Sequence, residues 1–297
     1  CARRLAVPPE TPPEPTLAGG LNHILMQLRT MTGHDFSLYK KSTVGRRIAR
    51  RMSQHTIDDA DVYIRFLKEN LAEVRLLFKE LLINVTSFFR DPDAFVVLQK
   101  EILPALLKGK PGDFIFRVWV AGCATGEEAY SIAILLRELM DEARETFKVQ
   151  IYSTDLADEA IAVARAGLYP LNIAQDVSRE RLQRFFVREE GGYRVKKEIR
   201  EMIVFAIQNV IKDPPFTRLD LLCCRNLMIY LEPELQNRLL VAFHYALKPG
   251  GVLFLSPSES IGNQTELFSS INRKWKLYRA SPSLKTVSAV MAQGSAG

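Results

Sequence analysis

The chain has 297 residues, of which 47% are hydrophobic and 25% are charged. This composition excludes a wholly disordered polymer, and the length suffices for one large domain or two modest ones. No run reaches the roughly 18 apolar residues that a membrane-spanning helix needs, and no signal-peptide pattern opens the chain, so we expect a cytoplasmic protein. The net charge of +6 favours an acidic partner and leaves nucleic acid, a membrane surface and an acidic protein face as alternatives.

The four cysteines include the adjacent pair Cys223 and Cys224, and none of them forms a CxxC motif. Neither a disulfide framework nor a zinc site therefore has the spacing that it needs. We expect reduced thiols and no bound metal.

The two ends of the chain differ in composition from the rest. The segment 7–16, VPPETPPEPT, is typical of an extended, solvated linker, which we place at 1–20. The segment 281–297 is small and polar, and we expect it to be disordered.

Between 21 and 90 the apolar residues recur at helical spacing. One example is Val44, Ile48 and Met52, which are four residues apart and fall on one face of a helix. Comparable runs precede and follow it, and no convincing strand interrupts them. The sequence predicts a small all-α domain over 21–90.

From 91 to 280 short apolar runs alternate with helices. This pattern predicts an α/β domain whose mostly parallel sheet is covered on both faces, with ligands bound beyond the carboxyl ends of the strands. The segment 178–202 interrupts the alternation, and its central glycine pair predicts a short helix and an antiparallel hairpin inserted into that domain. The predicted strands are RVWVAG, VQIYSTD, MIVFAIQNVI, LDLLCC, GVLFLS and KWKLYRA.

The loop GCATGEEAYSIA, residues 122–133, follows the first predicted strand. Its glycines do not form the GxGxxG fingerprint, and Glu127 and Glu128 lie where phosphates would need positive potential, so a dinucleotide is disfavoured. A carboxylate in the first helical turn can instead pair with an ammonium or a sulfonium, and S-adenosylmethionine carries both. The alternative is that the two carboxylates only stabilise the helix dipole.

Three more polar residues follow predicted strands. Asp155 ends the second strand, where an acid accepts hydrogen bonds from ribose hydroxyls, although it could instead cap the next helix, as could Asp158. Asn209 and Asn226 follow later strands, and their amides suit an adenine edge or an amino-acid head group. Loop-capping asparagines are the alternative for each.

Together these stretches resemble the CheR-type methyltransferases of bacterial chemotaxis, which use S-adenosylmethionine to esterify glutamates on chemoreceptors. The resemblance spans roughly 21–280. It implies a class I methyltransferase (Rossmann-like) sheet with a small inserted antiparallel β-subdomain, preceded by an all-α domain. It also implies S-adenosylhomocysteine as the product and the acidic helical methylation region of chemoreceptors as the partner. The matching stretches are NVTSFFRD (84–91), GCATGEEAYSIA (122–133), STD (153–155), QNV (208–210) and CRNLMIYL (224–231).

The resemblance assigns site residues position by position. A glutamate carboxylate, with a reference pKa of about 4.3, is already ionised at neutral pH and needs no general base. The enzyme therefore has to align the attack, and we expect Arg90 to orient the acceptor carboxylate and Tyr230 to line the acceptor side. The implied cofactor contacts are Asn84, Thr86, Arg90, Glu127, Glu128, Asp155, Asn209, Val210, Asn226 and Leu227.

The segment YKKSTVGRRIARRM, 39–52, carries six basic residues between 40 and 51 and no acid. Uncompensated charge of this kind favours docking of an acidic helix, although a plain solvated face is the alternative. We expect the docking residues to be Arg46, Arg47, Arg50 and Arg51.

Two stretches depart from the family pattern. Ser256 to Glu259 reads SPSE where the family often has GHSE, so any role of that histidine is missing. The hairpin loop at Gly191 and Gly192 is short, which counts against docking of a receptor-tail peptide on the β-subdomain.

Other functions remain as alternatives. The proline-rich start resembles the junction in proteins that fuse a methylesterase to the methyltransferase, so we expect fused methylesterase or sensor domains, with contact to the membrane only through the receptor. A non-catalytic module that binds S-adenosylmethionine is one rival. The segment DPPF, 213–216, matches the signature of N-methyltransferases, but it precedes the strand LDLLCC instead of following it. We therefore expect no nucleic-acid partner.

Overall fold

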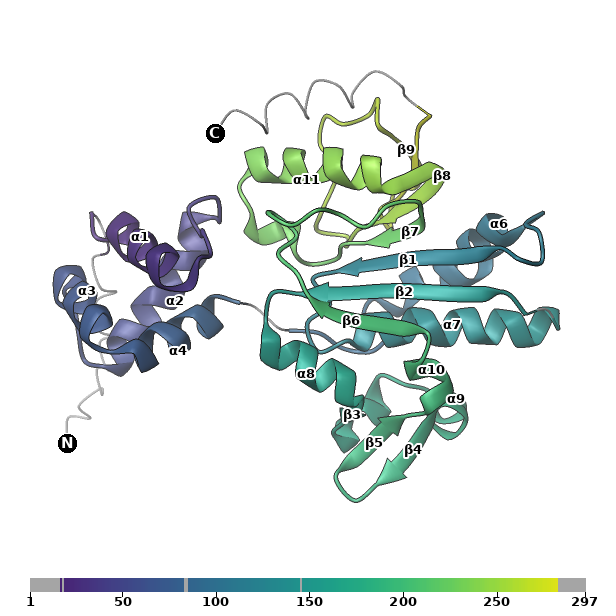
Figure 1. Ribbon diagram of the computed structural model, residues 1–297, viewed down its shortest axis with the longest axis horizontal. Coiled ribbons are helices and arrows are strands. Elements are labelled where there is room, and N and C mark those ends of the chain that lie inside the picture. The colour runs from purple at the N-terminus through teal and green to yellow at the C-terminus, as the bar shows by residue number, and fades with distance from the viewer. Residues whose placement is uncertain (1–16, 18, 83–84, 145, 283–297) are drawn as a thin grey trace, which may run out of the picture. The chain divides into compact units, whose positions relative to one another are not determined.

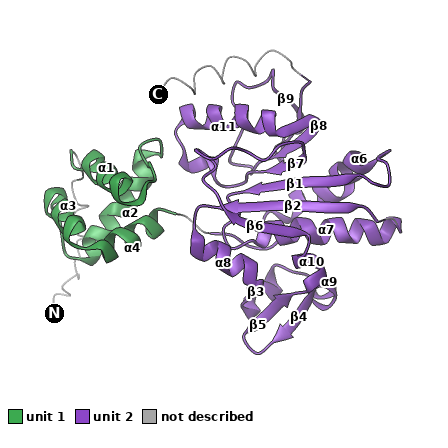
Figure 2. Ribbon diagram, in the orientation of Figure 1, with its two compact units in different colours: residues 1–82 green, residues 83–297 purple. Residues whose placement is uncertain are grey.

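The computed structural model describes residues 17, 19–82, 85–144 and 146–282 (Figure 1). Most of the predicted linker at 1–20 and nearly all of the predicted tail at 281–297 lie outside these residues. The chain divides into two compact units, Cys1–Leu82 and Ile83–Gly297 (Figure 2), so the division falls earlier than the expected boundary at 90. A search of the described residues finds no helix that is long and apolar enough to cross a membrane.

The described residues of the first unit form four helices, α1 (Leu21–Thr32), α2 (Lys41–Gln54), α3 (Ala60–Glu69) and α4 (Leu71–Leu81). Asp59 and Asn70 cap α3 and α4 by accepting backbone N–H groups in the first turn of each helix. The apolar residues at helical spacing, Val44, Ile48 and Met52 among them, are buried in one core. The predicted all-α domain is confirmed.

The second unit is built on a seven-stranded sheet with the order β6-β2-β1-β7-β8-β10-β9. The first five strands in this order pair in parallel, and β10 is antiparallel to both of its neighbours. The mostly parallel sheet is therefore confirmed. The strands are β1 (Ile115–Ala121), β2 (Lys148–Asp155), β6 (Ile203–Ile207), β7 (Leu219–Cys223), β8 (Leu247–Phe254), β9 (Phe268–Asn272) and β10 (Leu277–Ala280). We did not predict β9, because its sequence FSSIN lacks a regular alternation.

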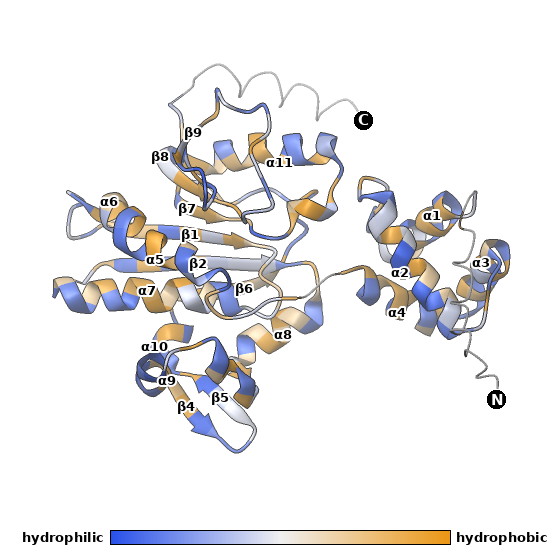
Figure 3. Ribbon diagram, turned by 180° about the vertical axis from the view of Figure 1, so that it is seen from behind, coloured by the Kyte–Doolittle hydropathy of each residue, from blue (hydrophilic) through white to orange (hydrophobic). Residues whose placement is uncertain are grey.

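Helices cover the two faces of this sheet. Residues of β1 alternate between them: Val118 and Val120 pack in the core that contains α7, whereas Trp119 meets Phe243 of α11 with ring centroids 5.9 Å apart. Bands of apolar and polar residues along these helices are visible in Figure 3. The helices are α5 (Pro92–Val97), the π-helical turn η1 (Leu98–Ile102), α6 (Leu103–Leu107), α7 (Glu127–Ala143), α8 (Asp158–Ala166) and α11 (Pro233–Ala246).

A small antiparallel sheet with the order β3-β5-β4 is inserted after α8. The predicted hairpin is present, but a third strand, β3, joins it from before the expected bounds. The strand β3 has only two residues, which is too short for a periodic pattern in the sequence. Gly192 is required here, because a Cβ at its position would overlap the carbonyl oxygen of Tyr169. The elements are β3 (Leu168–Tyr169), η2 (Leu171–Gln175), α9 (Arg179–Phe185), β4 (Phe186–Glu189), β5 (Gly192–Val195) and α10 (Lys197–Arg200).

Candidate active site

The loops that follow β1, β2, β6 and β7 meet at one edge of the sheet because these strands run parallel (Figure 1). Backbone hydrogen bonds join neighbouring loops. The N–H groups of Gly122 and Cys123 donate to the carbonyl of Thr154 at 2.8 and 3.0 Å, and the N–H of Gln208 donates to that of Asp155 at 3.0 Å. The carboxyl-terminal edge is thus one connected surface.

The loop after β1 contains backbone conformations that residues other than glycine rarely adopt. Gly122 and Gly126 have φ angles of 74° and 96°, and Ala124 has a φ of 48°. A Cβ on Gly126 would lie 2.8 Å from the Cβ of Ala164 in α8, so the start of α7 approaches α8 more closely than a side chain allows. The two glycines therefore let this loop pack closely against Leu227 and against α8.

Asp155 links two of these loops. Its Oδ2 accepts the N–H of Ala124 at 2.8 Å, and its Oδ1 accepts the N–H of Ala157 at 2.9 Å. Burial raises the pKa of this carboxyl, and the backbone hydrogen bonds act in the opposite direction. Ala157 precedes the first residue of α8, so Asp155 shapes the turn before that helix. Each carboxylate oxygen can accept a second hydrogen bond, so these backbone contacts are compatible with the predicted ribose contact.

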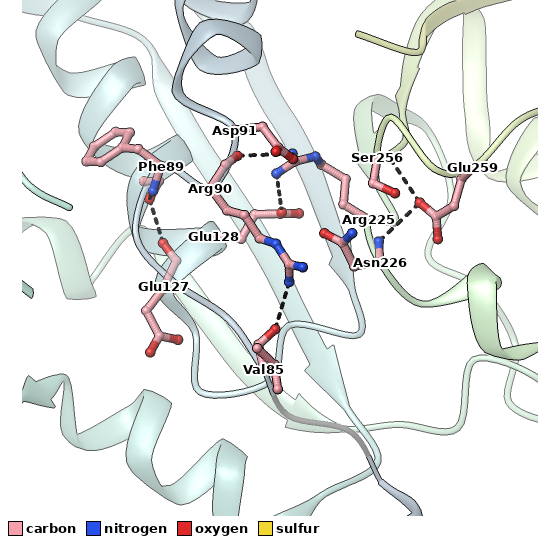
Figure 4. Close-up of polar contacts among 11 residues, drawn as sticks. Val85, Phe89, Arg90, Asp91, Glu127, Glu128, Arg225, Asn226, Ser256 and Glu259 are labelled. Atoms are coloured by element: carbon pink, nitrogen blue, oxygen red, sulfur yellow. Dashed lines mark hydrogen bonds and ion pairs between the residues drawn. The ribbon is translucent and has the colours of Figure 1, made fainter. Parts of the chain in front are cut away.

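The paired acids at the start of α7 have different surroundings (Figure 4). Glu127 accepts hydrogen bonds from the hydroxyl of Thr125 at 2.7 and 2.9 Å. Glu128 points instead toward Arg225, whose Nη1 donates to its Oε2 at 2.9 Å. Burial raises the pKa of both carboxyls, and for Glu128 the charge of Arg225 opposes that rise. Only Glu128 belongs to the charged network of the site.

Arg225 lies at the centre of that network and is a residue that the sequence reasoning missed. Its side chain is fully buried, and besides Glu128 it binds Asp91 at 2.6 Å and the carbonyl oxygen of Arg90 at 3.0 Å. The sequence shows only an arginine inside the motif CRN. Its position directly after a buried strand was the one available signal.

The segment 85–91 carries Arg90 into the site. Arg90 Nη1 donates to the carbonyl oxygen of Val85 at 2.8 Å (Figure 4). The N–H of Phe89 donates to the hydroxyl of Ser131 at 3.0 Å. Thr86 is half-buried in the same segment. Asn84, the other contact expected here, lies outside the described residues.

The loop after β7 holds Asn226 and Leu227 and leads to Tyr230. Asn226 has a φ of 60°. Leu227 packs beside Gly122, since a Cβ on that glycine would lie 3.1 Å from the leucine side chain. Tyr230 is half-buried at the end of the 3₁₀ turn η3 (Met228–Tyr230). The structure thus brings these predicted residues to the same edge as Glu128.

The loop after β6 is closed by its own side chains. The N–H of Asn209 donates to Asp213 at 2.7 Å, and Asn209 Oδ1 accepts the N–H of Ile211 at 3.0 Å; Val210 lies between them, half-buried. Phe216, the last residue of DPPF, stacks on Tyr152 with ring centroids 4.2 Å apart. This aromatic side chain is engaged in packing on the sheet, which weakens the N-methyltransferase reading.

The predicted docking arginines belong to the first unit and differ from one another. Arg51 forms a bidentate pair with Glu73, whose side chain is only 1% exposed. Arg47 and Arg50 both lie near Glu80, with Arg50 at 3.4 Å. Within the described part of this unit, no ion pair involves Arg46. Arg51 is therefore bound internally, and the four arginines do not form one uniform free surface.

Two family models match the chain. Residues 84–277 match the model described as "CheR methyltransferase, SAM binding domain", and residues 20–82 match "CheR methyltransferase, all-alpha domain". These matches cover most of the chain and fall on the two compact units. The chain belongs to the CheR methyltransferase family, and the resemblance identified from its motifs is confirmed.

Curated relatives agree with this assignment. The chain is 40% identical over 257 residues to an uncharacterized 104.1 kDa protein in the hypE 3′ region of Rhodobacter capsulatus, covering 86% of this chain and 27% of that protein. It is 34% identical over 242 residues to the chemotaxis protein methyltransferase of Salmonella typhimurium, with 78% and 80% covered. It is 32% identical over 238 residues to chemotaxis protein methyltransferase 1 of Pseudomonas aeruginosa, with 78% and 86% covered.

The residues at the carboxyl-terminal edge fit S-adenosylmethionine. Two acidic side chains at this edge, Glu128 at the start of α7 and Asp155 at the end of β2, have the chemistry that suits its cationic group and its ribose hydroxyls. The chain is therefore a methyltransferase of the class that uses this donor, with the expected class I sheet, inserted β-subdomain and all-α unit.

Proposed function

We propose that this protein transfers a methyl group from S-adenosylmethionine to glutamate side chains in the acidic methylation helices of chemoreceptors. The observation that carries the proposal is the position of the cationic residue Arg90. Arg225 binds both the carbonyl oxygen of Arg90 and the side chain of Glu128, at the carboxyl-terminal edge of the sheet. Family membership supports it, as do relatives named chemotaxis protein methyltransferases.

The proposal assigns the binding of the donor to the loops at this edge. When bound, S-adenosylmethionine supplies a methyl group on a sulfonium sulfur, and its transfer leaves S-adenosylhomocysteine. Glu128 would hold the positive charge of the donor, and Asp155 its ribose hydroxyls. The other residues that would hold it are Asn84, Thr86, Arg90, Glu127, Asn209, Val210, Asn226 and Leu227.

The acceptor needs orientation more than activation. A glutamate carboxylate is ionised at neutral pH, since its reference pKa is about 4.3. Arg90 would align it through charge-assisted hydrogen bonds, and Tyr230 would line its path. A fully buried, tight ion pair would reduce the nucleophilicity of the carboxylate. The half-buried position of Arg90 is consistent with a role in orientation.

The receptor would dock on the basic helix α2. Arg46, Arg47 and Arg50 can each present positive charge to an acidic helix, whereas Arg51 is engaged with Glu73. The Rhodobacter relative, of which the chain covers 27%, supports the presence of further fused domains in this type of protein, and the proposal takes these to be methylesterase or sensor domains. The proposal also includes a cytoplasmic location, a link to the membrane only through the receptor, and no nucleic-acid partner.

Incubation with methyl-labelled S-adenosylmethionine and receptor-containing membranes tests this function. We expect label in the receptor and, after proteolysis, a mass gain of one methyl group on glutamate-containing peptides. Donor binding without any labelled receptor would support a non-catalytic regulatory module instead.

A further inference from the structure

The buried arginine of the site has three polar partners. Arg225 Nη1 donates to Glu128, while Nη2 donates both to Asp91 and to the carbonyl oxygen of Arg90 (Figure 4). Its guanidinium also lies over the ring of Phe254, 4.6 Å from the centroid. A buried charge is tolerated only when it is paired, so this arrangement depends on both carboxylates. A lysine could not reproduce it, because an ammonium is a point charge and not a planar fork.

Arg90 lies between two residues with left-handed backbones. Phe89 has a φ of 49° and Asp91 a φ of 60°. Residues with side chains avoid this region, so such a segment persists only where its surroundings fix it. Two contacts do so: Ser131 accepts the N–H of Phe89, and Arg225 binds both Arg90 and Asp91. Arg225 therefore fixes the backbone on which the Arg90 side chain is mounted.

Glu128 connects the contacts of Arg225 with Arg90 and Asp91 to the donor site. Its Oε2 is bound by Arg225, whereas its Oε1 makes no hydrogen bond to any residue that the structure describes. A cation at Oε1 competes with Arg225 for the charge of the carboxylate. The guanidinium then interacts more strongly with Asp91 and with the carbonyl oxygen of Arg90.

We propose that Arg225 is a positioning residue that couples occupancy of the donor site at Glu128 to the ordering of the segment carrying Arg90. A loaded enzyme then presents an oriented Arg90, and an empty one presents a looser segment. This inference rests on the proposed function only for what Arg90 acts upon. The coupling itself is an equilibrium property and is measurable without methyl transfer.

Hydrogen exchange of a peptide spanning 85–95, with and without saturating S-adenosylhomocysteine, tests the coupling. This ligand has the ammonium group and cannot react. We expect exchange in the wild-type protein to slow by about 10-fold on binding, as for a locally stabilised segment. In Arg225→Lys and Asp91→Asn the slowing should fall below about twofold, and by linkage the affinity for the ligand should fall by a comparable factor.

The Asp91→Asn variant keeps the test usable if the Arg225 variant misfolds, because the Asp91 side chain is 34% exposed and its substitution disturbs the core less. Lys248→Met is the matched control: it removes the ion pair with Asp220 at 2.8 Å, at the amino ends of β7 and β8, and exchange in this variant should slow on binding as in the wild type. Full slowing in folded Arg225→Lys and Asp91→Asn would overturn the coupling. If the wild type did not bind S-adenosylhomocysteine, the coupling and the proposed function would both be overturned. If the ligand slowed hydrogen exchange as expected but the receptor were not methylated, only the proposed function would be refuted.

Discussion

Glu259 holds the backbone of Asn226 in place: its Oε2 accepts the Asn226 N–H at 3.1 Å. The same carboxylate accepts the N–H groups of Met228 at 2.8 Å and Ser256 at 2.9 Å. One buried acid therefore holds the backbone of the loop after β7. Glu259 is the last residue of the SPSE stretch, in which the histidine of the family pattern is missing. The glutamate of that stretch therefore has a structural role that needs no histidine.

Glu259→Gln should weaken donor binding. An amide has one accepting oxygen, so at least one of three backbone N–H groups loses its partner, at a cost of about 1–3 kcal/mol in the free energy of unfolding. We expect affinity for S-adenosylhomocysteine, measured by calorimetry, to fall several-fold with a lower Tm. Unchanged affinity and Tm would show that the loop does not depend on this carboxylate.

Arg90→Ala should reduce catalysis more than folding. Misplacement of reacting groups by about 1 Å costs about 10²-fold in rate, and we expect a loss of that order in kcat/KM for receptor methylation. The side chain makes one described hydrogen bond, to the carbonyl of Val85, so Tm should change little. Turnover equal to that of the wild type would remove Arg90 from the mechanism.

The arginines of α2 should separate into two classes. Arg51→Ala leaves buried Glu73 without its charged partner and should destabilise the first unit by about 3–5 kcal/mol. Arg46→Ala should leave Tm unchanged but raise KM for the receptor. Thermal denaturation and receptor methylation measured on both variants check this. Equal effects of the two on Tm would contradict the assignment.

Glycine at 126 should be essential for the donor site. Gly126→Ala introduces a Cβ 2.8 Å from that of Ala164 at a φ of 96°, and should displace the start of α7. The matched control is Gly250→Ala, at a φ of 79° with no atom within 4 Å, which adds a comparable backbone strain of about 1–2 kcal/mol without a clash. We expect ligand affinity to fall sharply only for Gly126→Ala. Equal affinity for the two would show that the close approach is unimportant.

Acidification should loosen the first unit through Glu73. Burial alone would raise the pKa of this carboxyl, but hydrogen bonds from Arg51, Tyr63 and His55 outweigh it and hold the pKa below its usual value. A lowered pKa stabilises the fold above the unfolded-state pKa of about 4.5, and this contribution is lost as the pH falls through the folded-state pKa.

Hydrogen exchange of α3 and α4, corrected for its intrinsic pH dependence, should show protection falling below about pH 4.5 in the wild type. In Glu73→Gln the fall should be smaller, because the titrating group is absent. Identical pH profiles in the two proteins would exclude Glu73 as the origin.

The fold could be predicted from the sequence because its signals are local. Strand β6, IVFAI, is a continuous apolar run, and polar residues such as Asp155, the last residue of β2, and Asn226, shortly after β7, fall at strand ends by sequence position alone. The short strand β3 and the irregular strand β9 carry no such periodicity.

The network around Arg225 could not be predicted in this way. Its partners Asp91 and Glu128 lie 134 and 97 residues earlier in the chain, so only the folded structure brings the three together. Arg51 is a similar case: the pattern along α2 shows a basic face, but Glu73, 22 residues later, converts one of its arginines into a buried partner. Long-range pairing, not local propensity, separates the predicted site from the observed one.

The most direct test of carboxyl methylation is the chemistry of the product. Receptor membranes labelled by this protein from methyl-labelled S-adenosylmethionine are treated with mild alkali, and volatile methanol is collected. Glutamyl methyl esters hydrolyse under these conditions, so we expect the label to appear as methanol from the wild type and much less from Arg90→Ala. Label that stays on the receptor through alkali would contradict ester formation and indicate N-methylation instead.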